Sequence, residues 1–303
     1  MSYPSYVLIT AARDEADNIE RTIQSVIAQT VLPLRWTIVS DGSTDGTDDI
    51  VMRYAVRYDW IELFRRPDNE ERNFASKTQS VEQAYHRLAG IEFDVLGNVD
   101  ADISFPPDYM EYLLTKLAES PELGIVGTPY VEEGFHSWTD TLGDPRDIPG
   151  ACQLFRRACW EAIGGYLHIK GGGEDWAAVR TAWFKGWETR SWPERTCVHH
   201  RRHGTGRASV WKSRMHYGTR DYSQGNPAAW EVLRALYHMK NKPYVLGGAL
   251  IFAGYLSAWI RRANSPLPPE VVAVHRADQQ ARLRAMFRKA FRISRILHSS
   301  RKE

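Results

Sequence analysis

The sequence predicts an α/β protein, in which a Rossmann-like mixed sheet flanked by helices is followed by a helical C-terminal region. Short apolar runs alternate with segments of helical periodicity through the first third of the chain, as is typical of βαβ units. Polar turns follow the apolar runs, at the sheet edge where open α/β folds bind ligands. Near the C-terminus the composition becomes basic and amphipathic. We therefore place one domain at residues 1–220 and a helical region at residues 221–303.

The N-terminal elements form a strand–helix–strand–helix series. Residues 6–10 are a compact apolar strand, and a helix starts at Asp17 or Asn18, either of which could cap it. Apolar side chains follow at helical spacing: Ile19, Ile23, Val26 and Ile27. A second strand at residues 36–39 ends in an Asp- and Gly-rich turn, and the next helix covers about residues 48–57.

A pair of aspartates, Asp100 and Asp102, follows a third apolar strand at residues 93–97. Residues two apart on an extended segment point to the same side, so both carboxylates can converge on one ligand. Adjacent carboxylates repel each other unless a cation neutralises them, and hard oxygen ligands suit Mg²⁺ or Mn²⁺. Asp-x-Asp alone is common in loops, and its weight here comes from the motifs around it.

Five motifs resemble, in order, those of family 2 glycosyltransferases with the GT-A fold. They lie at residues 10–15, 39–45, 98–102, 164–166 and 171–176. The resemblance implies an inverting, metal-dependent glycosyltransferase that moves a sugar from a nucleotide-sugar, with a UDP-sugar favoured, to a hydroxyl group. The acceptor would be a lipid-linked saccharide in surface polysaccharide biosynthesis. Ala11 stands where relatives usually have proline, which alters the rigidity of the turn more than its chemistry.

The resemblance also implies roles for individual residues around the donor. The nucleotide-sugar would be bound by Thr10, Arg13, Glu15, Asp41, Lys77 and Asp100. Asp41 would read the base or ribose, since a carboxylate accepts hydrogen bonds from ring N–H groups and hydroxyls. Asp100 and Asp102 would hold the metal. Lys77 resembles a lysine near the donor, although an exposed helix lysine explains it nearly as well.

A second acidic pair, Glu174 and Asp175, follows three glycines and precedes a helix expected from Ala177 onward. The glycines allow the backbone to approach the sugar closely. Asp175 resembles the family's catalytic base, which takes a proton from the acceptor hydroxyl, and Glu174 is expected to orient the acceptor. A purely structural alternative is that both residues cap the helix, which is compatible with catalysis.

Three histidines and two arginines lie together late in the first domain. Imidazole is a good ligand for Mn²⁺, and guanidinium binds diphosphate in a bidentate manner. Relatives often supply a late histidine as a third metal ligand, and His199, His200 and His203 are the candidates, with His200 and His203 preferred equally. Arg201 and Arg202 are the expected diphosphate ligands. The alternative is a solvated basic loop.

Length and composition fit one α/β domain with an appendage. The chain has 303 residues and 43% hydrophobic residues, which permits a sizeable core and excludes a disordered chain. The cysteines Cys152, Cys159 and Cys197 have neither disulfide nor metal-site spacing, so we expect reduced thiols in a cytosolic protein. Arg13 and Asp14 interrupt the opening apolar stretch too early for a signal peptide.

The C-terminal region is strongly basic. From Arg261 to Glu303 there are 11 Lys and Arg against 3 Asp and Glu, a net charge of +8, so the preceding 260 residues carry −6. Residues 282–297 form a basic amphipathic pattern, typical of a helix on an anionic membrane surface. Upstream, residues 244–260 are an uncharged run of 17 residues that contains three glycines. This run is short for a span, and we expect it to lie partly in one leaflet; packing on the catalytic domain is the alternative.

These features predict a peripheral or monotopic enzyme on the cytoplasmic face of the inner (plasma) membrane. Its partners would be a nucleotide-sugar donor, a lipid-linked or saccharide acceptor and an anionic membrane surface, but no nucleic acid; oligomers are left open. One alternative is a polyprenyl-phosphate glycosyltransferase resembling dolichyl-phosphate mannose synthase. Its acceptor is already anionic and needs no base, so Glu174 and Asp175 argue against it. A non-catalytic membrane scaffold with this fold is the second alternative, and the retained aspartates argue against that.

Overall fold

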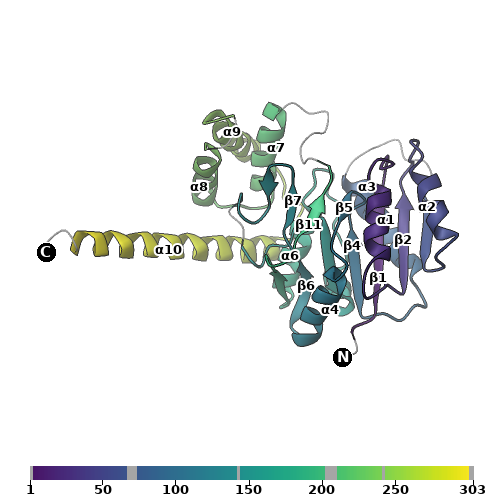
Figure 1. Ribbon diagram of the computed structural model, residues 1–303. Coiled ribbons are helices and arrows are strands. Elements are labelled where there is room, and N and C mark those ends of the chain that lie inside the picture. Colours follow the sequence, from purple (N-terminus) through teal and green to yellow (C-terminus); the bar gives the residue numbers. More distant parts are fainter. Residues whose placement is uncertain (1–2, 67–73, 142–143, 202–209, 241–242, 300–303) are drawn as a thin grey trace. The chain divides into compact units, whose positions relative to one another are not determined.

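The chain forms two compact units, Met1–Arg202 and His203–Glu303 (Figure 1). The computed structural model describes residues 3–66, 74–141, 144–201, 210–240 and 243–299. The predicted domain boundary at residue 220 falls inside helix α7 (Val210–Ser223). Because α7 packs along helix α9 (Leu246–Ile260) of the second unit, the whole helix belongs to that unit.

The first unit is built on a seven-stranded sheet with the order β10-β6-β9-β4-β1-β2-β3. Its strands are β1 (Tyr6–Ala12), β2 (Arg35–Ser40), β3 (Ile61–Arg65), β4 (Val95–Val99), β6 (Leu123–Gly127), β9 (Cys152–Arg156) and β10 (Glu188–Ser191). Strand β9 runs antiparallel to its neighbours β4 and β6, and the other pairs in this sheet are parallel. The predicted mixed α/β sheet is therefore confirmed.

Helices cover both faces of this sheet. One hydrophobic cluster contains α1 (Ile19–Ile27), α2 (Thr47–Ala55) and α4 (Tyr109–Glu119), and the other contains α3 (Phe74–Arg87), α5 (Arg157–Ile163) and α6 (Glu174–Phe184). Along β1, Tyr6 and Leu8 join the first cluster, while Val7 and Ile9 join the second. This alternation follows from the strand period of two, and burial on both faces explains the continuous apolar run.

A second, four-stranded sheet has the order β5-β11-β7-β8. Its strands are β5 (Ile103–Ser104), β7 (Tyr130–Glu132), β8 (Phe135–His136) and β11 (Cys197–His199). Strand β5 comes directly after the aspartate pair, and His199 of β11 pairs in register with Ile103. This pairing brings the late histidine segment beside the turn that carries Asp100 and Asp102.

The predicted early elements are confirmed by β1, α1, β2 and α2, with small shifts at their ends. Asn18 occupies the N-cap position of α1 but makes no side-chain capping hydrogen bond. Strand β4 ends at Val99, and residues 100–102 form a turn. The prediction that Asp100 and Asp102 lie on an extended segment is therefore wrong. Helix α6 begins at Glu174 and not at Ala177, which places both predicted catalytic carboxylates in its first turn. The three cysteines are free, in agreement with the expected reduced thiols, and all three are buried.

The second unit contains α7, α8 (Ala228–His238), α9 and α10 (Pro269–Ser299). The first half of α10 packs within this unit: Val271 and Leu283 are buried, and His275 Nε2 lies 2.7 Å from Asn226 Oδ1. The predicted amphipathic helix at residues 282–297 is thus the second half of a longer helix, and the side chains after Arg288 lie outside the description. Within the described ranges, none of the helices combines the length and apolarity needed to cross a membrane.

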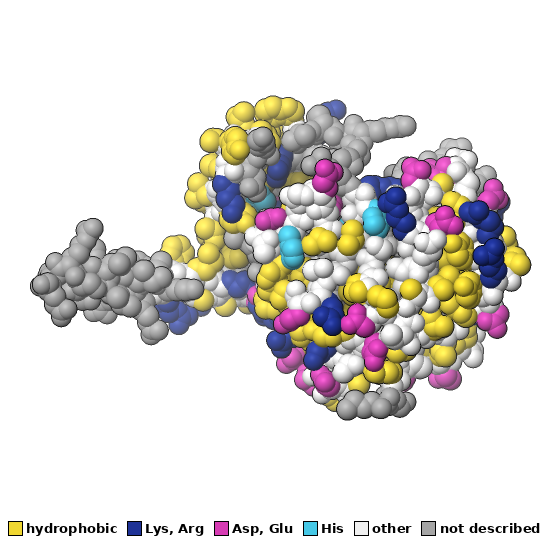
Figure 2. All heavy atoms as spheres, in the orientation of Figure 1, with side chains coloured by type: hydrophobic (Ala, Val, Ile, Leu, Met, Phe, Trp, Pro, Cys, Tyr) yellow, Lys and Arg dark blue, Asp and Glu magenta, His cyan; other side chains and the backbone are white. Residues whose placement is uncertain are grey.

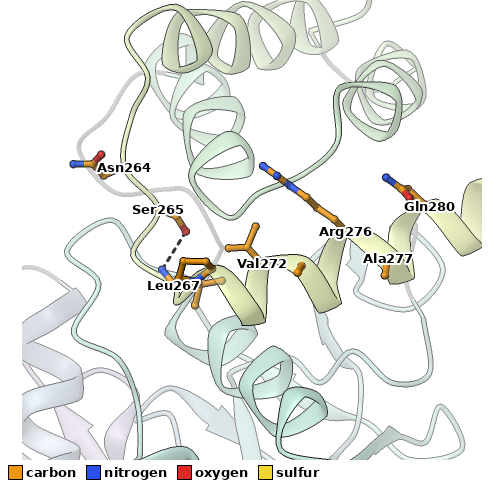
Figure 3. Close-up of a pocket in the computed structure, with 9 residues that line it drawn as sticks. Asn264, Ser265, Leu267, Val272, Arg276, Ala277 and Gln280 are labelled. Atoms are coloured by element: carbon orange, nitrogen blue, oxygen red, sulfur yellow. Dashed lines mark hydrogen bonds between the residues drawn. The ribbon is translucent and has the colours of Figure 1, made fainter.

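A groove of about 880 Å³ follows the start of α10 (Figure 3). It is lined by Asn264, Ser265, Leu267, Pro269, Val272, Ala273, Arg276, Ala277 and Gln280. Arg276 and Gln280 extend from the same side of the helix, and Arg276 Nε donates to the Gly225 carbonyl at 2.8 Å. This lining contains none of the predicted catalytic residues.

Candidate active site

The carboxyl ends of β1, β2 and β4 meet at one edge of the large sheet, because these strands are parallel neighbours. The turn containing Glu15 follows β1, Asp41 follows β2 and Asp100 follows β4. Backbone bonds fix these ends: the Asp41 N–H donates to the Ala12 carbonyl at the end of β1, and the Asp100 N–H donates to the Ala151 carbonyl just before β9, both at 2.9 Å. The sheet thus gathers the predicted donor-binding residues at one edge.

Within the described part of the chain, Asp100, Asp102 and His199 form a group that could hold a metal ion. One potential ligand atom of each residue lies within 4.8 Å of those of the others. Asp102 and His199 are buried, and burial raises the pKa of the Asp102 carboxyl, as does the nearby charge of Asp100. Two carboxylates and an imidazole are a donor set that suits Mn²⁺ or Mg²⁺, so the group is compatible with a divalent cation.

The hydrogen bond of His199 selects the tautomer that a metal site needs. His199 Nδ1 lies within hydrogen-bonding distance of the Arg201 carbonyl oxygen. Because a carbonyl only accepts, Nδ1 carries the hydrogen, and Nε2 presents its lone pair on the side of Asp102 Oδ1, 3.5 Å away. Glu132 Oε2, 3.7 Å from Nδ1, favours the same tautomer.

His200, one of the two preferred metal ligands, lies elsewhere in this neighbourhood. Its Nε2 is 2.8 Å from Ser104 Oγ, and its backbone N–H donates to the Asp102 carbonyl at 2.8 Å. Side chains alternate along β11, and His199 shares the buried side with Cys197. This alternation is a signal in the sequence that could have favoured His199 over His200 as a metal ligand. His203 and Arg202, also predicted as ligands, lie outside the described residues.

Lys77 contacts the metal-binding group directly. Its Nζ donates to Asp100 Oδ1 at 2.6 Å and lies 3.8 Å from Glu174 Oε1. Burial acts to lower the pKa of Lys77, but the carboxylates of Asp100 and Glu174 outweigh it and leave that pKa above its ordinary value. Lys77 therefore carries a fixed positive charge between the aspartate pair and the second acidic pair, and the alternative of an exposed helix lysine is wrong.

Asp41 is buried and held by an arginine that the sequence analysis did not single out. Arg66 Nη1 donates to Asp41 Oδ1 at 2.9 Å, and the Ser76 hydroxyl donates to Asp41 Oδ2. Arg13 Nη1 lies 3.8 Å from the same Oδ2. Arg66 directly follows β3, so the rule that identified Asp41, a polar residue at a strand's carboxyl end, also points to Arg66.

Arg201 and Glu15 lie on the other side of the aspartate pair. Arg201 Nη2 pairs with Glu15 Oε2, and Arg201 Nε is 3.7 Å from Asp102 Oδ2. Burial raises the pKa of Glu15 to about 7, and the charge of Asp102 adds to this effect. Thr10 is fully buried, and its hydroxyl accepts a 3.0 Å bond from the Trp36 indole. The Thr10 side chain thus has no exposed surface with which to bind the nucleotide-sugar, contrary to the prediction.

Glu174 and Asp175 differ in their surroundings although they are adjacent. Gly173 at the N-cap has φ 94°, a left-handed conformation that favours glycine. Glu174 is 5% exposed, and burial raises its pKa to about 7 although Lys77 opposes this shift. Its Oε1 lies 3.8 Å from Lys77 Nζ, so this buried carboxylate is paired with a cation. Asp175 is only partly buried, which makes it the more accessible carboxylate of the pair.

Gly150 leaves room for the Asp175 carboxylate. A Cβ at this position would lie 2.8 Å from Asp175 Oδ2. We expect Gly150→Ala to displace the carboxylate and to lower turnover by roughly tenfold or more, since a small misplacement of a reacting group is costly. Steady-state kinetics will measure this loss. In an Asp175→Asn background the same change should have no further effect; equal losses in both backgrounds would contradict a role through Asp175.

Comparison with known families identifies similar sequences. The model of the family described as Glycosyl transferase family 2 matches residues 7–159. A glucosyl-dolichyl phosphate glucuronosyltransferase from Haloferax volcanii is 26% identical over 132 residues, which covers 43% of this chain and 38% of that protein. Glycosyltransferase AglE of the same organism is 28% identical over 83 residues, 27% of each chain. The chain thus aligns with less than two fifths of either relative.

Solved structures share the fold at low sequence identity. The mannosyltransferase PcManGT from Pyrobaculum calidifontis, in complex with GDP-Man and Mn²⁺, superposes with a TM-score of 0.59 at 16% identity, covering 91% of this chain and 79% of that one. S. aureus TarS 1-349 with UDP-GlcNAc gives a TM-score of 0.51 at 12% identity, covering 85% and 73%. At these identities the likeness establishes the fold alone.

Proposed function

The chain belongs to glycosyl transferase family 2 and has the GT-A fold, and from this premise we propose the reaction of its sheet-edge site. The enzyme transfers a sugar from a nucleoside-diphosphate sugar, with UDP-sugars as the first choice, to a hydroxyl group of a lipid-linked saccharide. The reaction inverts the anomeric centre and serves surface polysaccharide biosynthesis. One observation carries the proposal: Lys77 joins the metal-binding group to the acidic pair that begins α6, so donor and acceptor chemistry share one site.

Different residues of the site would bind different parts of the donor. Asp41, held by Arg66 and Ser76, lies where a nucleoside would be read, and the Lys77 and Arg201 cations flank the aspartate pair where a diphosphate would lie. When bound, Mn²⁺ or Mg²⁺ supplies positive charge that stabilises the diphosphate leaving group. The preference of the Asp100 and Asp102 carboxylates for hard cations, with His199 as a third possible ligand, supports this cofactor.

Direct displacement accounts for inversion. The acceptor hydroxyl oxygen attacks the anomeric carbon from the face opposite the diphosphate, its proton passes to an Asp175 carboxylate oxygen, and the bond from the anomeric carbon to the diphosphate oxygen breaks. The nucleoside diphosphate leaves with the bonding electron pair. Asp175 suits this role because its carboxylate is accessible, whereas Glu174 is buried beside Lys77.

A lipid-linked saccharide is the acceptor class with the most support. The name of the glucuronosyltransferase relative describes an enzyme of glucosyl-dolichyl phosphate, a sugar already attached to a lipid phosphate. The partly exposed Asp175 suits a neutral hydroxyl, which must lose a proton during transfer. A polyprenyl phosphate is already ionised, so transfer to it would not require the Asp175 carboxylate as a base.

Radiolabelled transfer with matched acceptors tests the proposal. The enzyme is incubated with UDP-, GDP- and dTDP-sugars, with Mn²⁺ or EDTA, and offered either a polyprenyl-linked sugar or polyprenyl phosphate. We expect Mn²⁺-dependent transfer to the polyprenyl-linked sugar. Transfer only to polyprenyl phosphate would show that the acceptor is polyprenyl phosphate and not a lipid-linked saccharide. The absence of both transfer and donor hydrolysis with every donor would favour a non-catalytic scaffold.

The proposed location is the cytoplasmic face of the plasma membrane, with peripheral or monotopic attachment. The chain after Arg288 contains Lys289, Arg292, Arg295, Arg301 and Lys302 against Glu303. Each cation near an anionic surface contributes about 1 kcal/mol, which salt screens. A location at the membrane would give the enzyme access to a lipid-linked acceptor.

Truncation after Arg288 is expected to weaken binding to anionic vesicles at low salt, because five cations are lost. The cut spares the buried residues of α10, such as Val271 and Leu283, which truncation after Arg262 would remove. Co-sedimentation with phosphatidylglycerol-containing vesicles is the measurement, and neutral phosphatidylcholine vesicles are the control. Turnover on a short soluble acceptor should be unchanged. Equal sedimentation of the two proteins at low salt would exclude a role for the tail.

A further inference from the structure

Helix α9 exposes one continuous apolar stripe. No residue of α9 is charged, and a helix that is apolar on all sides is normally buried. Its exposed residues recur at helical spacing along one side: Leu246, Ala249, Phe252, Ala253, Leu256, Trp259 and Ile260. Trp259 is 59% exposed and Ile260 is 67% exposed. An exposed stripe of this composition marks an interaction surface.

The opposite side of α9 is fixed by close helix contacts within its own unit. A Cβ at Gly248 would overlap the Ala235 carbonyl oxygen of α8, and one at Gly254 would overlap the Met215 carbonyl oxygen of α7. In α7, a Cβ at Gly218 would overlap the Ile251 carbonyl oxygen. These backbone contacts hold α9 in one rotation, so the apolar stripe cannot turn inward. Two of the three glycines of residues 244–260, Gly248 and Gly254, are therefore packing sites.

Helix α8 adds exposed apolar side chains on the neighbouring helix. Val232 and Leu236, one helical turn apart, are both exposed, and α8 packs directly against α9. Hydrophobic side chains gather over the part of the molecule where α8 and α9 are drawn (Figures 1 and 2). We call this surface the α8–α9 face, defined by Val232, Leu236, Leu246, Phe252, Leu256, Trp259 and Ile260.

The exposed charged residues that flank α9 in the sequence are all cationic. Lys240 precedes α9 and Arg261 and Arg262 follow it, all with exposed side chains. Between residues 228 and 264 the only acidic residue in the sequence is Glu231, which is fully buried. Among the described residues between 228 and 264, the exposed charges are therefore all cationic and include no carboxylate.

We propose that the α8–α9 face docks on an anionic lipid bilayer, with α9 lying in the plane of the interface. Its apolar stripe would enter the boundary between head groups and acyl chains, and Lys240, Arg261 and Arg262 would meet lipid phosphates. Trp259 combines a large apolar ring with a polar N–H, which suits this interface. The helix lies in the plane because 15 residues extend only about 22 Å, less than the thickness of the hydrocarbon core.

A bilayer fits this face better than a second copy of the chain does. A symmetric dimer would place the same patch on both subunits, so the exposed cations of residues 228–264 would lie near identical cations, and that stretch offers no exposed carboxylate to pair with them. Anionic head groups supply the missing charge. The proposal goes beyond the transfer reaction, and it identifies a docking surface other than the basic tail.

Vesicle binding by the full chain tests the proposal. Leu256→Gln/Trp259→Gln removes two adjacent side chains of the stripe, and the matched control Leu34→Gln/Val56→Gln removes two exposed apolar side chains of the first unit. We expect the first variant to bind phosphatidylcholine–phosphatidylglycerol vesicles about tenfold more weakly or worse, at low and high salt, and the control to bind normally. Equal binding by both variants would overturn the proposal.

Two further measurements separate the outcomes. Brominated acyl chains should quench the fluorescence of Trp259, and Trp259→Phe should abolish this quenching while retaining vesicle binding. Sedimentation velocity without vesicles tests whether a second copy of the chain is the partner. If the wild-type protein is a dimer and the Leu256→Gln/Trp259→Gln variant is a monomer that still binds vesicles normally, the partner of this face is a second copy and not the bilayer. Neither measurement uses donor or acceptor, so failure here is distinguishable from failure of the proposed reaction.

Discussion

Asp102→Asn is expected to lower metal-dependent transfer by about 10²- to 10³-fold, because a metal ion at a reacting diphosphate contributes several kcal/mol. Asp102 is buried between Asp100 and His199, and the amide removes one of the two negative charges that attract the cation. The fold should persist, since an uncharged amide relieves the repulsion between the carboxylates.

Isothermal calorimetry with Mn²⁺ and transfer kinetics measure this effect. Asp94→Asn is the matched control: Asp94 lies before the other end of β4, where its Oδ2 accepts two hydrogen bonds from Ser5 at 2.8 Å. The control should bind Mn²⁺ normally. Full activity of Asp102→Asn in the presence of EDTA would show that Asp102 is not a metal ligand required for transfer.

The second large effect is expected for Asp175→Asn, which should lower turnover by about 10²-fold or more, the scale of a lost general base. Donor affinity should change little, because Asp175 acts on the acceptor and Lys77 keeps its contacts with Asp100 and Glu174. Turnover and donor affinity therefore have to be measured separately, by transfer kinetics and by donor calorimetry.

Glu174→Gln provides the comparison. This change removes a buried carboxylate beside Lys77 and should alter donor binding as well as turnover, whereas Asp175→Asn should alter turnover alone. If Asp175→Asn loses donor binding but has normal turnover at saturating donor, Asp175 binds the nucleotide, and the catalytic base is another residue.

The positions of the early strands were predictable because local patterns determine them. The apolar runs predicted at residues 6–10, 36–39 and 93–97 correspond to the parallel strands β1, β2 and β4, which have polar residues at their carboxyl ends. This rule brought Asp41 and the aspartate pair to one edge. The rule does not reveal β9, which runs antiparallel between β4 and β6. That placement depends on pairing between distant segments, which local periodicity does not encode.

The details of the site depended on the same distant contacts. His199 faces the aspartates because β11 pairs with β5, and Lys77 reaches Asp100 across 23 positions in sequence. For the uncharged run at residues 244–260, the sequence showed the apolar composition but not which side is buried. That choice is made by the close approach of α7 and α8 to the glycines of α9.

Those helix contacts restrict how this part of the chain can vary. At Gly218, Gly248 and Gly254 any side chain would meet a carbonyl oxygen of a neighbouring helix, and a backbone cannot yield as a flexible side chain can. Tolerance of substitution should therefore be as low at these positions as at the reacting carboxylates, although they take no part in the chemistry. Glycine at all three positions would mark other sequences that share this helical unit, and a sequence with larger residues there must cross its helices differently.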